Sequence, residues 1–322
     1  METASPKVHL HGAAHAPISD RGRVVAIGVF DGMHIGHQAL LQHAIHTASV
    51  HNLDSCAYTF DPHPLALLRP DHAPIMLESI STRIQRLTNL GITTVIVEPF
   101  TQNLANTSPE NFVQHILHEQ LQAKHIVVGD GFRFGNKQRG DLALLRLCAE
   151  QYNIHVHAIH HAMIDHEKVS SSRIRQALAN ADLSFARKLL GRYPRMHGII
   201  VHGRHQGARL GFPTANLKTD VPVILPRGVY AAQCHGSFGT RIAAVNIGFA
   251  PTLHDHRFQV EAHLLDHESG SLYGESMSID FALKIRDEIS FPNIEALKHQ
   301  ISTDIACIRR FWSKEISCNV TL

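Results

Sequence analysis

The fold of the first half of the chain is decided by residues 24–37, which read VVAIGVFDGMHIGH. Val24–Val29 is a short apolar run, typical of a buried strand, and a helical pattern follows from about His37 to Val50. The glycines between the two allow the sharp turn that such a junction needs. A strand, a glycine-rich turn and a helix in this order predict the first unit of an α/β sheet, with an anion site where the unpaired N–H groups of the helix begin.

Strand-like and helix-like stretches go on alternating to about residue 180. The expected strands are Ser55–Phe60, Thr94–Glu98, His125–Val128 and Ile154–Ile159, and the expected helices are Ser79–Leu90, Pro109–Leu121, Asp141–Tyr152 and Ser171–Asn180. Helices of about 10–15 residues between strands are typical of parallel βαβ units. We therefore predict a Rossmann-like α/β domain, a parallel sheet with helices on both faces that binds its ligands at the carboxyl ends of the strands.

The expected secondary structure changes after about residue 182. A short helix over Leu183–Gly191 is followed by β-rich runs with turn residues between them, and no helix is expected from His197 to Lys284. The runs are His197–His202, Gly228–Cys234, Arg241–Ile247, Phe258–Leu265 and Ser276–Leu283. They predict a small antiparallel β-barrel, closed by a helix over about Asn293–Phe311. We therefore expect two domains, residues 1–185 and residues 186–322.

Length and composition agree with two globular domains. A chain of 322 residues exceeds the size of about 250–300 residues at which single cores stop growing. Its 44% of hydrophobic residues excludes disorder, and a formal charge of +2 is too even for a dedicated nucleic-acid binder. No apolar run approaches the roughly 18 residues of a membrane span, and residues 1–20 do not look like a signal peptide. Five scattered cysteines without a C-x-x-C pair indicate a reducing compartment, so we expect a cytoplasmic protein with small-molecule partners and neither nucleic acid nor a membrane.

The count of 27 histidines raises an alternative, a metal-binding protein. The nearest candidate ligands are His155, His157, His160 and His161, and also His202 and His205. In a strand, His155 and His157 would share one face. No acidic residue or cysteine accompanies them at a usual ligand spacing, so the pattern does not favour a metal site.

The turn within residues 28–37 carries the first chemical signal. Its candidate nucleotide-binding residues are Gly28, Phe30, Asp31, Gly32 and Gly36. The glycines let a phosphate approach the backbone closely. His34 and His37 can direct N–H donors at the charge that develops on a transferring phosphoryl group, which makes them candidate catalytic residues.

A second segment, residues 169–175 (VSSSRIR), precedes a helix. Ser171 and Ser172 place hydroxyl groups at the helix N-terminus, and Arg175 lies one turn further in. Hydroxyls, free backbone N–H groups and a guanidinium together suit a triphosphate. Alone, this pattern is that of an ordinary capped helix, so it gains meaning only beside the H-x-G-H segment.

With residues 59–64 (TFDPHP) and 129–135 (GDGFRFG), these segments resemble the signature of the H-x-G-H nucleotidylyltransferases. The set as a whole is similar to the FAD synthetase half of the bacterial bifunctional riboflavin kinase/FAD synthetases. The resemblance implies that His34 and His37 bind and activate the phosphates of ATP, and that His63 lies beside them at the nucleotide site.

The same resemblance implies that Ser171, Ser172 and Arg175 hold the triphosphate from the opposite side. It places the loop of residues 129–135 near the flavin phosphate or the adenosine. Two positions depart from the family's pattern. The family usually has Asp or Asn where Gly131 stands, which removes a polar contact, and Thr where this chain has Ser172, which keeps the hydroxyl.

The second half contains a glycine-punctuated loop, residues 203–216 (GRHQGARLGFPTAN). Backbone amides around Gly203 and Gly207 can wrap a phosphate, and Thr214 and Asn216 offer hard oxygen ligands for Mg²⁺. The loop is not a Walker A motif, because G-x-x-x-x-G-K-[ST] is absent from the chain. In isolation it reads as a turn-rich connection between strands.

Further motifs of the second half are residues 226–230 (PRGVY), 246–248 (NIG), 251–252 (PT), 260–266 (VEAHLLD), 272–274 (LYG) and 284–288 (KIRDE). In this order they resemble the riboflavin kinase domain. The resemblance implies a six-stranded barrel in which Thr214 and Asn216 bind Mg-ATP. Glu261 would accept the proton of the ribityl 5′-hydroxyl as that hydroxyl attacks the γ-phosphate. Arg286 and Glu288 would lie near the flavin.

Together the two resemblances run from about Arg23 to Phe311. They imply a bifunctional enzyme that converts riboflavin and ATP to FMN and ADP, and then FMN and ATP to FAD and pyrophosphate. Mg²⁺ would bridge phosphates in both reactions. One departure in the kinase half is Ala208, where the family often has Arg; Arg209 is displaced by one position.

An alternative within the same family is a riboflavin kinase whose first domain has decayed to a regulatory nucleotide-binding module. Gly131 would be the sign of such decay. The intact His34, His37 and Arg175 favour an active adenylylating domain instead.

Overall fold

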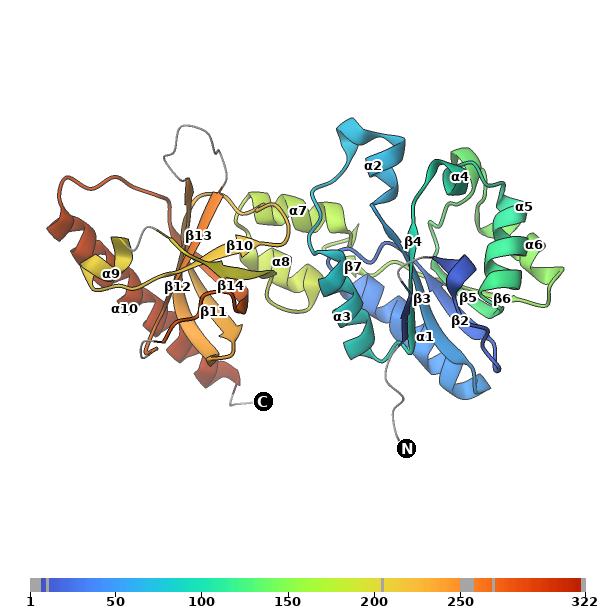
Figure 1. Cartoon of the computed structure of the whole chain (residues 1–322), viewed down its shortest axis with the longest axis horizontal. Helices are drawn as coiled ribbons and strands as arrows, with labels where there is room; N and C mark the ends of the chain where they lie inside the picture. Colours follow the sequence, from blue (N-terminus) through green and yellow to red (C-terminus); the bar gives the residue numbers. More distant parts are fainter. Residues whose placement is uncertain (1–6, 10–11, 204–205, 250–257, 268–269, 320–322) are drawn as a thin grey trace. The chain divides into compact units, whose positions relative to one another are not determined.

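The computed structural model of the chain (Figure 1) describes residues 7–9, 12–203, 206–249, 258–267 and 270–319. Arg204 and His205 of the glycine-punctuated loop, and Pro251 and Thr252, lie outside the described residues. The chain forms two compact units, Met1–Ser171 and Ser172–Leu322. This division precedes the boundary expected after residue 185, and the limits of the two functional domains stay a prediction.

The first unit is built on a six-stranded parallel sheet in the order β1-β4-β3-β2-β5-β6 (Figure 1), as predicted for an α/β domain. The strands are β1 (Lys7–His9), β2 (Arg23–Ile27), β3 (Asp54–Asp61), β4 (Thr94–Pro99), β5 (Ala123–Gly129) and β6 (His155–Ile159). From β2 the chain moves outward to β3 and β4, and then returns to the other side of β2 to form β5 and β6. The strand order therefore reverses between β2 and β5, and their carboxyl ends flank the crevice where such sheets bind ligands.

Helices cover both faces of this sheet because its strands are apolar on both sides. α1 (Ile35–His51) and α3 (Ile80–Leu90) pack with Val24 and Ala26 of β2, whereas Val25 and Ile27 face η3 (Phe112–Gln120) and α6 (Leu142–Glu150). These four β2 residues are fully or almost fully buried. Burial of each Val or Ile side chain contributes roughly 1.5–3 kcal/mol, so this central strand anchors the sheet.

The helix expected over Pro109–Leu121 differs from the prediction in type. α5 (Pro109–Asn111) opens it, and η3 continues it as a π-helix, with the amide of Leu121 donating to the carbonyl of Ile116. The wider turn keeps Phe112, Leu117 and Leu121 all buried against the sheet. A sequence pattern does not distinguish this spacing from that of an α-helix. The minor elements of this unit are η1 (Ala13–His15), α2 (Pro64–Leu68), η2 (Pro70–His72), α4 (Gln102–Ala105), η4 (Asn136–Gln138), β7 (Met163–Ile164) and β8 (Glu167–Lys168).

The second unit is a closed antiparallel barrel of six strands in the order β10-β13-β12-β11-β14-β9, which confirms the predicted barrel. The strands are β9 (Arg195–Val201), β10 (Ala215–Thr219), β11 (Gly228–Gly236), β12 (Gly239–Phe249), β13 (Phe258–Leu264) and β14 (Ser276–Arg286), and α7 (Ser171–Ala179) and α8 (Leu183–Leu190) precede them. The expectation that no helix lies between His197 and Lys284 is wrong, because α9 (Gln206–Leu210) does. Gly211, with φ +92°, ends this helix after five residues, too few to produce a periodic pattern.

A long final helix, α10 (Ile294–Asn319), packs on the outside of the barrel. Its buried Ile308 and Trp312 contact a cluster that includes Ala231 and Ala282 of the barrel strands. The helix extends beyond the Phe311 end expected from the sequence. Within the described ranges, no helix is both long enough and apolar enough to cross a bilayer.

Candidate active sites

The turn after β2 is held in a conformation that few residues other than glycine adopt. Phe30, Gly32 and Met33 all have positive φ angles, of 55°, 75° and 41°. A Cβ atom at Gly32 would overlap the side chain of Leu77, and one at Gly28 would lie 2.9 Å from the ring of Phe30. The sequence around this turn is therefore fixed by close packing as well as by any ligand.

Asp31 organises this turn from within. It is 2% exposed, and its carboxylate accepts hydrogen bonds from the backbone N–H groups of Leu77 (3.0 Å) and Glu78 (3.3 Å). Its backbone carbonyl accepts a hydrogen bond from the hydroxyl of Ser171 (2.8 Å). The structure thus joins two segments, the H-x-G-H turn and the start of α7, that lie 140 residues apart in the chain.

His34 and His37 form a stacked pair at the start of α1. His34 is the N-cap, and its Nδ1 accepts a hydrogen bond from the backbone N–H of His37 (3.2 Å). The two ring centroids lie 3.6 Å apart, and the edge of Phe30 contacts the ring of His37. Gly36 permits this stacking, because a Cβ atom there would lie 3.3 Å from the His34 ring.

The electrostatics of this pair suit a site for an anion. Burial, and then the nearby His34 and Lys168, hold the pKa of His37 well below its usual value of 6.5. A neutral imidazole still donates one N–H, and a bound phosphate would favour the imidazolium. The pair stands where the N–H groups of the first turn of a 17-residue helix have no partners within the helix.

Arg83 of α3 supports both halves of this site, although the sequence pattern did not single it out. Its side chain is 1% exposed and donates to the carbonyls of Val29 (2.9 Å) and Phe60 (3.2 Å) and to the carboxylate of Asp61 (3.2 Å). Burial lowers the pKa of Arg83, although Asp31 and Asp61 oppose this effect. One guanidinium thus joins the turn after β2 to the end of β3.

The other predicted residues of this half lie at the start of α2 and on α7. His63 follows β3 and is the N-cap of α2, where its Nδ1 accepts from the backbone N–H of Leu65 (3.1 Å). Ser172 and Arg175 lie on α7, which begins at Ser171. Their role in binding a triphosphate stays a prediction.

In the barrel, strand register brings the candidate kinase residues together. Glu261 of β13 pairs directly with Asn216 of β10 on one side and with Asn246 of β12 on the other. Residues opposite each other on adjacent strands present their side chains to the same face. Glu261 therefore stands between two carboxamides. Asn246 belongs to a motif noted in the sequence, but no role was predicted for it.

One metal-ligand candidate, Asn216, is paired with Glu261, and the other, Thr214, lies two residues before it in the chain. Asn216 is 9% exposed, and a Cβ atom at Gly203 would overlap its amide group. A Cβ atom at Gly207 would overlap the carbonyl of Phe212 and lie 3.2 Å from the hydroxyl of Thr214. Both glycines are thus needed for the loop to close over Thr214 and Asn216. A hydroxyl and an amide oxygen are hard donors, so the residues present fit Mg²⁺.

A pocket of about 410 Å³ joins Thr214 and Glu261 with the predicted flavin residues, whereas Asn216 lies outside its lining. Thr214 and Glu261 line it, and so do Arg286 and Glu288. Its apolar lining includes Ile289, Phe291, Leu297 and Ile301. A lining of both polar and apolar side chains suits a substrate with an aromatic ring and a hydroxylated chain.

Two further pocket residues were missed by sequence reasoning. His263 lies two positions from Glu261 on β13, hence on the same face, and its Nδ1 lies 2.8 Å from the carbonyl of Pro213. Asp304 of α10 is 4% exposed and forms an ion pair with Arg286 (2.9 Å). The alternation in residues 260–266 could have indicated His263, whereas nothing local indicates Asp304.

Of the histidines considered as metal ligands, His155 and His157 contact other histidines, His160 and His161 contact Asp130, and His202 stacks on Tyr273, whereas His205 lies outside the described residues. Nε2 of His157 lies 3.0 Å from Nδ1 of His125, and Nδ1 of His157 lies 3.2 Å from Nε2 of His43. The rings of His155 and His51 also pack on His125. Across the described ranges, no group of three or more His, Cys, Asp or Glu residues is arranged to hold a metal ion.

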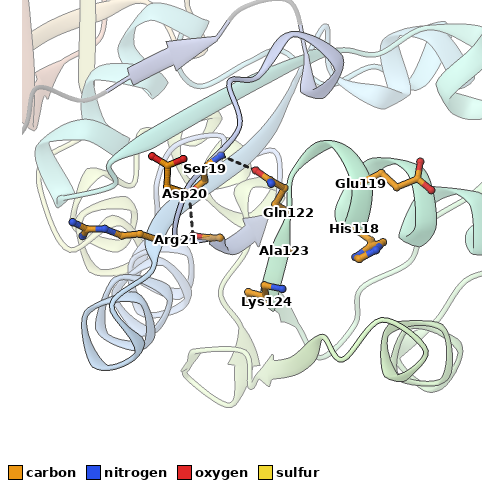
Figure 2. A pocket seen from close by; sticks show the side chains of 9 residues that line it. Ser19, Asp20, Arg21, His118, Glu119, Gln122, Ala123 and Lys124 are labelled. Atoms are coloured by element: carbon orange, nitrogen blue, oxygen red, sulfur yellow. Dashed lines mark hydrogen bonds between the residues drawn. The ribbon is translucent and has the colours of Figure 1, made fainter.

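Another cavity, of about 440 Å³, lies in the first unit at the amino end of β5 (Figure 2). Arg21 and Lys124 line it together with Asp20 and Glu119, so charges of both signs face the space. Gln122, which also lines it, accepts a hydrogen bond from the backbone N–H of Ser19 (2.6 Å). No residue predicted to bind a substrate lies there.

Comparison with known proteins gives one answer for each half of the chain. Residues 16–173 match the family model described as FAD synthetase, and residues 190–312 match the one described as riboflavin kinase. The bifunctional riboflavin kinase/FMN adenylyltransferase of Haemophilus influenzae is 34% identical over 294 residues, covering 91% of this chain and 95% of that protein. Its namesake from Escherichia coli is 35% identical over 304 residues, covering 94% and 96%.

A solved structure has the same fold over almost the whole chain. It is described as a macrolide-efflux protein from Streptococcus pneumoniae, and it superposes with a TM-score of 0.84 at 26% identity. The match covers 94% of this chain and 98% of that one. Both the α/β unit and the barrel therefore occur together in a second protein.

Proposed function

Because the chain belongs to the family of bifunctional riboflavin kinase/FMN adenylyltransferases, we propose that the barrel unit makes FMN from riboflavin and the α/β unit makes FAD from FMN. The observation that carries the kinase assignment is the row of Asn216, Glu261 and Asn246 on three paired strands. The observation that carries the adenylyltransferase assignment is the stacked pair of His34 and His37 at a helix N-terminus.

In the kinase reaction, Glu261 accepts the proton of the ribityl 5′-hydroxyl. The hydroxyl oxygen attacks the γ-phosphorus of ATP, the bond from that phosphorus to the β–γ bridging oxygen breaks, and ADP leaves. Thr214 and Asn216 would hold Mg²⁺, which neutralises phosphate charge when bound. Arg286 and Glu288, which line the same pocket, would bind the flavin.

In the adenylyl transfer, a phosphate oxygen of FMN attacks the α-phosphorus of ATP. The bond to the α–β bridging oxygen breaks and pyrophosphate leaves, so no proton needs to be removed from the nucleophile. His34 and His37 donate hydrogen bonds to phosphate oxygens whose charge rises in the transition state. Ser171, Ser172 and Arg175 would hold the rest of the triphosphate.

The assignment is tested by separating the two activities. Glu261→Gln should abolish conversion of riboflavin to FMN but leave conversion of supplied FMN to FAD near normal. His34→Ala should lower FAD formation by about 10²–10³-fold, the cost of losing one oriented donor, and leave FMN formation near normal. Products are separated by chromatography after incubation with Mg-ATP.

Three outcomes would contradict the proposal. Loss of both reactions in either folded variant would show that the activities do not reside in separate units. Absence of any flavin product from the unaltered chain would reject the function itself. FMN as the sole product of the unaltered chain would favour a kinase with a regulatory first domain.

We also propose that the enzyme works in the cytoplasm. The four cysteines that the structure describes, Cys56, Cys148, Cys234 and Cys307, are free thiols. Burial raises the pKa of Cys56 to about 12, so this thiol is unreactive. Free, buried thiols are typical of a reducing compartment.

A further inference from the structure

The ring of His161 occupies a space left by two glycines at the ligand-binding edge of the sheet. His161 follows β6, which pairs with β5 in a register that places Ile159 beside Gly129. A Cβ atom at Gly131 would lie 3.3 Å from Nε2 of His161, and one at Gly129 would lie 3.5 Å from its Cε1. The loop after β5 and the loop after β6 therefore meet at this ring.

The residue after His161 connects this place to the phosphate-binding turn. A Cβ atom at Gly36 would lie 3.7 Å from the Cβ atom of Ala162. The carbonyl of Ala162 accepts a hydrogen bond from the backbone N–H of Val169 (2.9 Å), in the segment that leads to Ser171. His161 thus lies one residue from the contact between two parts of the proposed adenylyltransferase site.

The surroundings of His161 determine which of its nitrogens carries the proton. Nε2 lies 2.6 Å from Oδ1 of Asp130; this contact lacks the geometry of a hydrogen bond, but so short a distance disfavours a lone pair on Nε2 beside the carboxylate oxygen. Burial, and then Lys168, lower the pKa of His161, although Asp130 opposes this effect. The side chain is then neutral near pH 7 and its Nδ1 carries a lone pair. Among the residues that the structure describes, no donor bonds to this Nδ1, and the side chain is 29% exposed.

We propose that His161, oriented by Asp130, binds substrate in the adenylyl-transfer site by accepting a hydrogen bond from a sugar hydroxyl at Nδ1. In both substrates, the atoms bonded directly to the phosphates belong to hydroxylated carbon chains, the ribose of ATP and the ribityl chain of FMN. A residue that lies next to the phosphate-binding turn therefore meets hydroxyl groups first. This inference rests on the proposed assignment of adenylyl transfer to the α/β unit.

The test compares His161→Phe with His161→Gln in the full chain. Phe keeps a flat ring but removes the acceptor, whereas Gln keeps an acceptor oxygen. We expect His161→Phe to raise the KM of the substrate that His161 binds by about tenfold, the value of one hydrogen bond to a neutral group, with kcat within about twofold. His161→Gln should recover most of that loss, and Asp130→Asn should lose less than His161→Phe.

A matched control is His160→Phe. His160 precedes His161 and its Nδ1 lies 3.4 Å from Oδ2 of the same Asp130, but its side chain is 96% exposed. We expect its KM values to match those of the unaltered chain. The kinase reaction of the same preparations normalises the enzyme concentration, and far-UV circular dichroism checks that the α/β unit is folded.

Deoxynucleotides identify which hydroxyl is bound. If His161 binds the ribose, 2′-deoxyATP or 3′-deoxyATP should be a poorer substrate than ATP for the unaltered chain, and His161→Phe should remove that difference. If it binds the ribityl chain, the KM of FMN should rise while discrimination against deoxynucleotides is unchanged. Either result supports a hydroxyl-binding role.

The inference is overturned if neither KM changes in His161→Phe, or if Phe and Gln cause equal losses, which would indicate a structural role. Failure of the proposed function is a separate result. In that case His34→Ala would leave FAD formation intact, whatever the outcome for His161.

Discussion

Replacement of Arg83 by Met should destabilise the α/β unit and misplace the H-x-G-H turn. The buried guanidinium donates to the carbonyls of Val29 and Phe60 and to the carboxylate of Asp61. Met preserves most of the volume of the aliphatic stem, so the substitution removes the polar contacts with little change in packing. The variant therefore isolates what one cation contributes to holding two loops together.

The expected loss of stability depends on which of the three acceptors keep another hydrogen-bond partner once the guanidinium is removed. The hydroxyl of Thr59 also donates to the carbonyl of Val29 (3.1 Å), and the side chain of Asp61 is 48% exposed and can be hydrated. The main loss is therefore one hydrogen bond to the carbonyl of Phe60, and an unsatisfied buried group costs about 1–3 kcal/mol. We expect a loss of about 2 kcal/mol, below the roughly 3–5 kcal/mol that breaking a fully buried ion pair costs.

Urea unfolding followed by far-UV circular dichroism measures this loss. With a slope of about 2 kcal/mol per molar urea, the midpoint of the α/β unit should fall by about 1 M. The single tryptophan, Trp312, lies in the barrel unit, so its fluorescence should keep the midpoint of the unaltered chain. Gln85→Met, at an exposed position of the same helix, is the control. An unchanged dichroism midpoint, or an equal shift in the Trp312 signal, would refute a local anchoring role for Arg83.

The α/β unit should lose stability in mild acid, because burial first, and then the neighbouring histidines, lower the pKa of His125 to about 4. Between pH 6.5 and about 4 the unfolded chain binds a proton that the folded chain does not, so the free energy of unfolding should fall with pH through this window, by about 1–3 kcal/mol. His125→Phe should flatten that dependence in urea titrations at several pH values; an equal slope in both proteins would contradict the cause. In the barrel, Asp304→Asn should raise the KM of riboflavin by about tenfold with little change in the KM of ATP, because Arg286 loses its ionic partner. Steady-state kinetics of the kinase reaction measure both constants, and parallel changes in both would argue against a role confined to the flavin end.

Much of the fold could be predicted from the sequence because the apolar runs are long and their periods are clear. Val24–Val29 and the helical pattern after it became β2 and α1, and the β-rich runs after residue 195 became the barrel strands. α9 was missed because five residues contain little more than one helical turn. The π-helical spacing of η3 was missed because the apolar pattern of residues 109–121 is also compatible with an α-helix.

The candidate sites were predicted in part. Phosphate-binding segments use consecutive backbone groups at a turn or helix start, so the candidate segments, residues 28–37 and 203–216, are contiguous in the sequence and can be recognised there. Asn246 is different, because its place beside Glu261 exists only through the register of β12 and β13. Arg83 and Asp304 reach their partners from distant helices, and an isolated charged residue in a helix gives no sign of a buried partner.

The histidines show that function, too, depends on contacts between residues distant in the sequence. The sequence contains 27 histidines, and their number alone suggested a metal site. His125 instead contacts other histidines, among them His157 and His51, the last residue of α1. A side chain that donates or accepts one proton takes its role from what lies within about 3 Å of each ring nitrogen. The surroundings of His37 favour a neutral imidazole that donates at a helix N-terminus. At His161 a carboxylate lies beside Nε2, which leaves the lone pair on Nδ1. If His161→Gln retains the KM values that His161→Phe loses, the difference between these histidines is one of environment, which the spacing of histidines along the chain does not encode.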